Sequence, residues 1–148
     1  MSHVLVFAYG SNMDPERMRA RVPGALSRGR ARLPGHRLVI DKRGRDGSAK
    51  ANLRPEAEAR VWGVLWEIVA ADLAALDGHE AGYERVTVSV ERETGPVEAH
   101  TYRSDRLAAG ALPFPWYLDH IVRGARAHGL PDEYVAWLAS LPSQRASC

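Results

Sequence analysis

Apolar residues follow two different spacings in the parts of the chain that read as strands. Residues 4–8 and 59–69 are almost continuously apolar, which is typical of strands covered on both faces. Residues 85–92 alternate between apolar and polar side chains, which predicts a half-buried strand. Residues 97–103 are the expected partner of this strand in a hairpin, with the turn at residues 95–96.

Helical segments are expected between and after these strands. The first covers residues 14–22, where Asp14 suits the N-cap and Pro15 suits the first helical position. A second, short helix is expected to be capped by Asp72 and to end at residues 77–78.

The last part of the chain has helical spacing beyond Pro113, and Gly129 and Pro131 divide it into two helices. Residues 25–41 suit one or two strands with a bend, and residues 43–48 suit a loop. This order predicts an α+β fold in a single domain of residues 1–148. We expect a small mixed, mainly antiparallel sheet that curls into a barrel, flanked by helices.

Composition and charge exclude several classes of function. The 148 residues are 45% hydrophobic and 26% charged, as in a folded domain, and the formal charge of +2 is too small to favour nucleic acid as a partner. The basic stretch 28–60 contains no aromatic residue on which bases could stack. Cys148 is the single cysteine, which excludes a disulfide within the chain and makes a poor catalytic candidate. Without a signal-peptide pattern or a membrane-length apolar run, we expect a soluble cytoplasmic protein with no membrane partner.

The turn that follows the first strand is the main candidate for binding. Gly10 lies between the strand and the helix, where free backbone N–H groups favour an anion. We therefore expect residues 9–12 to hold the charged head of a small substrate. Ser11 lacks the flanking glycines of a nucleophile elbow, and the sequence assigns it no Asp–His pair.

The remaining polar residues give weaker signals. The six histidines show no metal-ligand spacing, and the chain has no P-loop or dinucleotide fingerprint, so neither a metal nor a cofactor is expected. Glu80 follows the short helix, and by composition and spacing alone a solvated turn residue is the favoured interpretation. Core or helix packing is expected for the four tryptophans, Trp62, Trp66, Trp116 and Trp137.

Five motifs in fixed order resemble those of the γ-glutamylcyclotransferase family. They are Tyr9-Gly10-Ser11-Asn12, Val61-Trp62-Gly63-Val64-Leu65-Trp66, Leu76-Asp77-Gly78-His79-Glu80, Pro113-Phe114-Pro115-Trp116-Tyr117 and Gly129-Leu130-Pro131-Asp132-Glu133-Tyr134. The resemblance runs nearly from end to end of the chain. It implies an enzyme that cleaves a γ-glutamyl amide without water, releases 5-oxoproline and a free amine, uses no cofactor and forms a homodimer.

The resemblance also implies roles for individual residues. Glu80 occupies the position of the general acid/base, Tyr83 that of a tyrosine close to it, and Tyr117 that of a substrate contact. The implied substrate-binding residues are Val6, Phe7, Ala8, Tyr9, Gly10, Ser11, Asn12, Tyr83 and Tyr117.

The chain differs from the animal enzymes at two places. The connection from Glu80 to Tyr83 is shorter, and the loop around residues 47–52 lacks their paired glycines. Whether Lys50, Asn52 or Tyr102 reaches the pocket stays open. Two alternatives also stay open: a non-catalytic binding protein on the same scaffold, and a cyclotransferase for a γ-glutamylated secondary metabolite.

Overall fold

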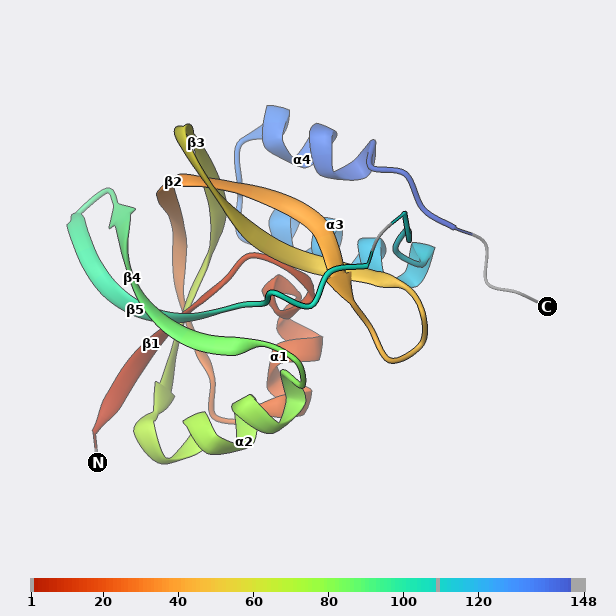
Figure 1. The fold of residues 1–148 in the computed structure, drawn as a ribbon. Helices are drawn as coiled ribbons and strands as arrows, with labels where there is room; N and C mark the ends of the chain where they lie inside the picture. Colours follow the sequence, from red (N-terminus) through yellow and green to blue (C-terminus); the bar gives the residue numbers. More distant parts are fainter. Residues whose placement is uncertain (1, 109, 145–148) are drawn as a thin grey trace.

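The computed structural model describes residues 2–108 and 110–144, in which five strands form a closed barrel (Figure 1). Cys148 lies outside the described residues. The elements in chain order are β1 (His3–Ala8), η1 (Ser11–Met13), α1 (Pro15–Arg21), β2 (Leu26–Arg43), β3 (Ala49–Val69), η2 (Ala70–Asp72), α2 (Leu73–His79), β4 (Glu84–Arg92), β5 (Gly95–Arg103), α3 (Pro115–Ala127) and α4 (Asp132–Ala139).

The strands follow the order β1-β3-β2-β4-β5 around the barrel. Every pairing between neighbours is antiparallel except the one that closes the barrel, where β1 and β5 run parallel and Val6 faces His100. This arrangement confirms the expected α+β fold with a mixed, mainly antiparallel sheet and two C-terminal helices.

The second and third strands are longer than the sequence pattern predicts. Residues 25–41 form most of one strand, β2, rather than two. Its register against β3 shifts between Pro34 and His36, where Gly35 takes a positive φ of 73° that a side chain would disfavour. The expectation of a loop over residues 47–52 is wrong from Ala49 onward, because β3 begins there.

Two boundaries also differ from the prediction. The turn between β4 and β5 is made by Glu93 and Thr94 rather than by residues 95–96, because Gly95 already pairs with Arg92. Asp72 precedes α2 without a capping hydrogen bond from its side chain. The helix continues past residues 77–78 to His79, which places Glu80 directly after its last turn.

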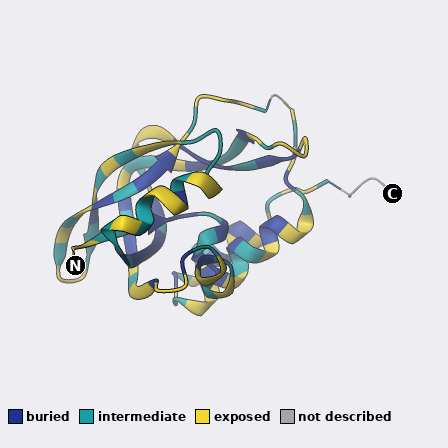
Figure 2. Cartoon of the chain, turned by 90° about the horizontal axis from the view of Figure 1, so that it is seen from below, coloured by how far each residue is buried: buried dark blue, intermediate teal, exposed yellow. Residues whose placement is uncertain are grey.

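The core fills the barrel and the space between the barrel and its helices. Phe7 and Trp66 are among the largest fully buried side chains, and Figure 2 shows buried and exposed residues alternating along the helices. A Cβ at Gly63 would lie 2.7 Å from the Phe7 ring and 2.4 Å from the Ala8 carbonyl, so only glycine lets β1 and β3 approach this closely. Trp66 is buried in the core, whereas Trp116 and Trp137 are exposed and pack against side chains of their own helices.

Candidate active site

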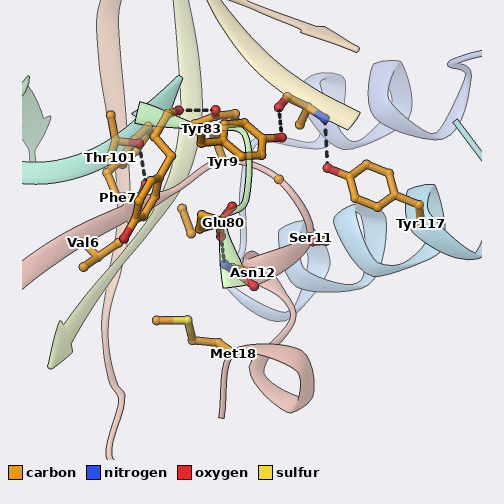
Figure 3. Close-up of a pocket in the computed structure, with 14 residues that line it drawn as sticks. Val6, Phe7, Tyr9, Ser11, Asn12, Met18, Glu80, Tyr83, Thr101 and Tyr117 are labelled. Atoms are coloured by element: carbon orange, nitrogen blue, oxygen red, sulfur yellow. Dashed lines mark hydrogen bonds between the residues drawn. The ribbon is translucent and has the colours of Figure 1, made fainter. Parts of the chain in front are cut away.

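The end of β1, the turn after it and the segment after α2 surround one hollow. The substrate-binding residues implied by the sequence all line it, together with Glu80. The complete lining is Val6, Phe7, Ala8, Tyr9, Gly10, Ser11, Asn12, Met18, Ala51, Glu80, Tyr83, Thr101, Tyr102 and Tyr117. Figure 3 shows that these side chains come from segments far apart in the sequence.

The turn after β1 leaves two backbone N–H groups of lining residues without a hydrogen bond within the described residues. Met13 N–H donates to the Gly10 carbonyl and Asp14 N–H donates to the Ser11 carbonyl, both at 3.1 Å. Within the described residues, no hydrogen bond is donated by the N–H groups of Gly10 and Ser11. Two adjacent free N–H groups at the start of a helical segment are suited to an anionic oxygen.

Buried Asp14 fixes this turn against the C-terminal helices. One carboxylate oxygen caps α1 by accepting from Glu16 N–H at 3.1 Å. The other oxygen lies 2.6 Å from His120 Nδ1 and accepts from Arg123 Nη1 at 3.1 Å, so both residues of α3 hold the same carboxylate. The turn is therefore tied to α3 as well as to β1.

An Asp–His pair therefore exists, which sequence reasoning did not find, but its geometry does not serve Ser11. The Ser11 hydroxyl oxygen accepts from Arg17 Nε at 2.9 Å. In the part of the chain that the structure describes, Ser11 has no hydrogen bond to His120. The arrangement holds Ser11 in place and gives it no base.

The Glu80 side chain lines the hollow and is largely shielded from solvent. Its Oε1 accepts from Asn12 Nδ2 at 2.8 Å and lies 3.4 Å from Arg21 Nη1, and its side chain is 13% exposed. Burial raises the pKa of Glu80 above its ordinary value, whereas Arg21 and the Asn12 hydrogen bond act in the opposite direction. Glu80 also follows the C-terminal end of α2, where the helix carbonyls disfavour a negative charge. A carboxyl with a raised pKa is suited to exchanging protons near neutral pH.

Asn12 forms hydrogen bonds through its backbone carbonyl and its side-chain Nδ2, but not through its side-chain Oδ1, within the described residues. Trp66 Nε1 donates to its backbone carbonyl at 3.0 Å, which fixes the main chain, and the side-chain amide donates to Glu80. Its Oδ1 is buried and has no hydrogen-bond partner within the described residues. A buried acceptor without a partner is costly, so this oxygen is available for a donor on a bound molecule.

Tyrosine hydroxyls fix the opposite wall of the hollow (Figure 3). Tyr83 donates to the Ala51 carbonyl at 2.6 Å, and Ala51 N–H donates to the Tyr117 hydroxyl at 2.9 Å. The Tyr9 hydroxyl donates to the backbone carbonyl of Tyr102. Burial raises the pKa of Tyr117 to about 12 and that of Tyr9 and Tyr83 well above the ordinary value. These hydroxyls are therefore neutral and act as hydrogen-bonding groups.

Sequence reasoning left open or missed several residues of the wall. Tyr102 lines the hollow and donates to Asp77 Oδ1 at 2.5 Å. Asn52 instead bonds Asp41 and the backbone of Ser104, and it is not among the lining residues.

Three further lining residues were not assigned to the site: Met18, Ala51 and Thr101. Thr101 donates to the Phe7 carbonyl at 2.8 Å and shares the buried face of β5 with Ala99. A polar residue at an inward position of a strand was the signal that could have identified it.

The structure offers neither a metal cluster nor a membrane-spanning helix in the residues that it describes. No group of three or more histidine, cysteine, aspartate or glutamate side chains there could hold a metal ion. No helix among these residues is long and apolar enough to cross a membrane.

Comparison with known proteins places the chain in a family. The model of the AIG2-like family matches residues 60–138. The chain is 33% identical over 142 residues to a mouse (Mus musculus) protein named gamma-glutamylcyclotransferase, covering 88% of this chain and 74% of the mouse protein. A bovine (Bos taurus) protein of the same name is 31% identical over 147 residues, covering 93% of this chain and 78% of its own.

A solved structure named gamma-glutamyl cyclotransferase has the same fold, with a TM-score of 0.91 and 29% sequence identity over 99% of this chain and 92% of the other. The resemblance seen in the sequence motifs is thereby confirmed. The chain belongs to the AIG2-like family, together with these proteins named gamma-glutamylcyclotransferase.

Proposed function

We propose that this protein is a γ-glutamylcyclotransferase, an enzyme that converts a γ-glutamyl amide into 5-oxoproline and a free amine. The names of its relatives support this activity. The observation that carries the proposal is the pairing of Glu80 with Asn12 at 2.8 Å, in the same hollow as the free N–H groups of Gly10 and Ser11. The reaction needs a base, which is Glu80 in this proposal, and a site that binds anionic oxygens. We call the N–H groups of Gly10 and Ser11 the anion clamp.

The clamp would position the substrate for an intramolecular attack. We infer that the N–H groups of Gly10 and Ser11 bind an anionic oxygen of the γ-glutamyl head or the oxyanion that develops on its γ-carbonyl. The unpaired Oδ1 of Asn12 would accept a hydrogen bond from the substrate's α-ammonium. When binding holds the amine next to its own γ-carbonyl, the entropy cost of bringing the two together is met before the chemical step. This can lower the barrier by several kcal/mol.

Glu80 would move the protons. As a carboxylate it takes a proton from the α-ammonium, and the freed amine then attacks the γ-carbonyl carbon and closes the five-membered lactam. When the oxyanion collapses and the amide C–N bond breaks, the protonated Glu80 gives its proton to the leaving amine. The regenerated carboxylate then takes the extra proton of the ring nitrogen and passes it to the same amine, which leaves as an ammonium. The raised pKa of Glu80 supports both steps, because the group must gain and lose a proton within one turnover.

The test is mass-spectrometric detection of 5-oxoproline from a panel of γ-glutamyl dipeptides and amines. We expect product with the parent protein and a loss of about 10²–10⁴-fold in turnover with Glu80→Gln. Glu84→Gln is the matched control, because Glu84 is exposed at the start of β4 and outside the hollow. Full activity in Glu80→Gln would contradict the assignment, and binding without product from any substrate would favour the binding-protein alternative.

Four expectations from the sequence remain predictions beside this proposal. They are the single domain of residues 1–148, the homodimer, the cytoplasmic location and, for the substrate, the alternative of a γ-glutamylated secondary metabolite. The substrate panel bears directly on the last of these.

A further inference from the structure

A second, more open hollow adjoins the first, and lysine and arginine side chains form much of its lining. Ser11, Glu80, Tyr83 and Tyr117 line both hollows, so the two are continuous at these residues. Five cationic side chains and one carboxylate, that of Glu80, belong to the lining of the outer hollow. The cations are Arg17, Arg21, Lys42, Arg45 and Lys50.

Most of this positive charge is not neutralised by carboxylates of the chain. Arg21 lies 3.4 Å from Glu80, and Lys50 lies 3.4 Å from Asp46. Among the described residues, the other three cations of the lining, Arg17, Lys42 and Arg45, form no ion pair. The chain carries a net charge of only +2, so this concentration is local.

Four of these cations are at least partly buried, and Arg45 is exposed. Lys42 is 6% exposed and donates to the Ala81 carbonyl at 2.8 Å. The Lys50 side chain is 17% exposed, and its Nζ lies 4.5 Å from the Tyr117 ring centre. Burial lowers the pKa of Lys50, and the nearby Arg17 acts in the same direction while Asp46 opposes it. Gathering like charges in partly buried positions is unfavourable unless an anion binds among them.

The position of the outer hollow assigns it to one half of the substrate. The inner hollow holds the turn proposed to bind the γ-glutamyl head. Glu80 lines both hollows. Under the proposed function it donates a proton to the leaving amine at this position. The leaving group must therefore extend from Glu80 toward the five cations. A neutral amino acid would bring one carboxylate to this hollow, which is fewer than its three unpaired cations.

We infer that the outer hollow selects leaving groups with at least two negative charges, so that the preferred substrates are γ-glutamyl amides of α-amino dicarboxylates. This inference rests on the proposed function and names its substrate class. Arg45 and Lys50 are the specificity-determining residues. Arg45 lies in the loop between β2 and β3, and Lys50 lies at the start of β3 (Figure 1). Lys50 also falls within residues 47–52, where the chain lacks the paired glycines of the animal enzymes.

The test compares γ-glutamyl-aspartate with γ-glutamyl-asparagine, which differ by one charge and hardly in shape. We expect kcat/KM to be about ten-fold higher for the aspartate substrate at low salt. The ratio should fall toward one between about 0.01 M and about 1 M salt, because the Debye length shrinks from about 30 Å to about 3 Å. Equal rates, or a preference for asparagine at low salt, would overturn the inference.

Variants that remove one positive charge test whether Arg45 and Lys50 cause the preference for the aspartate substrate. Arg45→Gln and Lys50→Gln should each lower the aspartate-to-asparagine ratio, and a ratio measured within one variant is independent of how much of that variant folds. Arg126→Gln is the control, because Arg126 is exposed in the last turn of α3 and outside both hollows. An unchanged ratio in both test variants would also overturn the inference. Product from both substrates at equal rates refutes the charge preference alone, whereas no 5-oxoproline from these two or from any other member of the γ-glutamyl panel refutes the proposed function as well.

Discussion

Asn12 donates its side-chain amide to Glu80 at 2.8 Å across 68 residues of sequence. This bond joins the turn after β1 to the segment after α2, so the two parts of the site are held at a fixed separation. It also favours the charged form of Glu80, in opposition to burial. The same residue pair therefore sets both the geometry and the protonation of the candidate active site.

Asn12→Ala should move the acidic limb of the pH profile upward. In its proposed role as the base, Glu80 must be deprotonated, so we expect kcat/KM to fall as the pH drops through its pKa. Removing the Asn12 hydrogen bond removes one of the influences that lower this pKa, which leaves burial less opposed. The measurement is kcat/KM against pH, which reports the pKa of the free enzyme. A limb that stays in place or moves to lower pH would contradict the role given to Asn12.

Glu80→Gln should change the pH dependence of stability. Because burial raises the pKa of Glu80 in the folded protein, the wild type loses stability as the pH rises from the unfolded value, near 4.5, through the folded one. Glutamine does not titrate, so the melting temperature of Glu80→Gln relative to wild type should rise between about pH 4 and pH 8. Thermal unfolding at several pH values measures the difference. The control Glu84→Gln, at an exposed position, should show no such trend.

The parts of the fold that the sequence predicted are those in which the apolar pattern alone decides the structure. Residues 59–69 are apolar on both faces and form a buried wall of the barrel. Residues 49–58 join the same strand although many are polar or exposed, because pairing with β2 rather than local preference makes them extended. Only the alternation of Ala49, Ala51 and Leu53, all buried, hinted at it.

Residues of the candidate site could be predicted where they belong to a sequence motif. Residues that reach the hollow only through tertiary contacts could not. The Tyr9–Asn12 turn and Glu80 were assigned from motifs, and the structure brings them to one hollow. Ala51 lines the same hollow, yet its contribution is a backbone whose position depends on Tyr83 and Tyr117. Sequence spacing carries no information about such a contact.

Ser11→Ala should weaken substrate binding more than it slows chemistry. The Ser11 hydroxyl accepts from Arg17 at 2.9 Å, so its loss frees Arg17 and loosens the turn, while Glu80 and Asn12 keep their hydrogen bond. We expect KM to rise about ten-fold, the equivalent of roughly one hydrogen bond, with kcat within a few-fold of wild type. Steady-state kinetics measure both. Loss of kcat as severe as in Glu80→Gln, with an acyl-enzyme detectable in the parent protein, would instead make Ser11 a nucleophile.

Gly124→Ala should destabilise the protein because α3 packs on the turn without room for a methyl group. A Cβ there would lie 2.2 Å from the Met13 carbonyl carbon and 2.4 Å from Asp14 N, and these backbone atoms cannot rotate away. Overpacking of this kind costs about 1–3 kcal/mol or more, which lowers the melting temperature by about 2–4 °C per kcal/mol. Displacing Met13 also moves the neighbouring Gly10 and Ser11, so KM should rise together with the loss of stability.

Gly78→Ala is the matched control for this substitution, since Gly78 is also helical and a Cβ there meets no atom within 4 Å. Because alanine is the better helix former by about 1 kcal/mol, this variant should be slightly more stable than wild type. Urea and thermal unfolding of both variants give the comparison. If Gly124→Ala were as stable as Gly78→Ala, the close packing of α3 against the turn would not be what holds the turn in place.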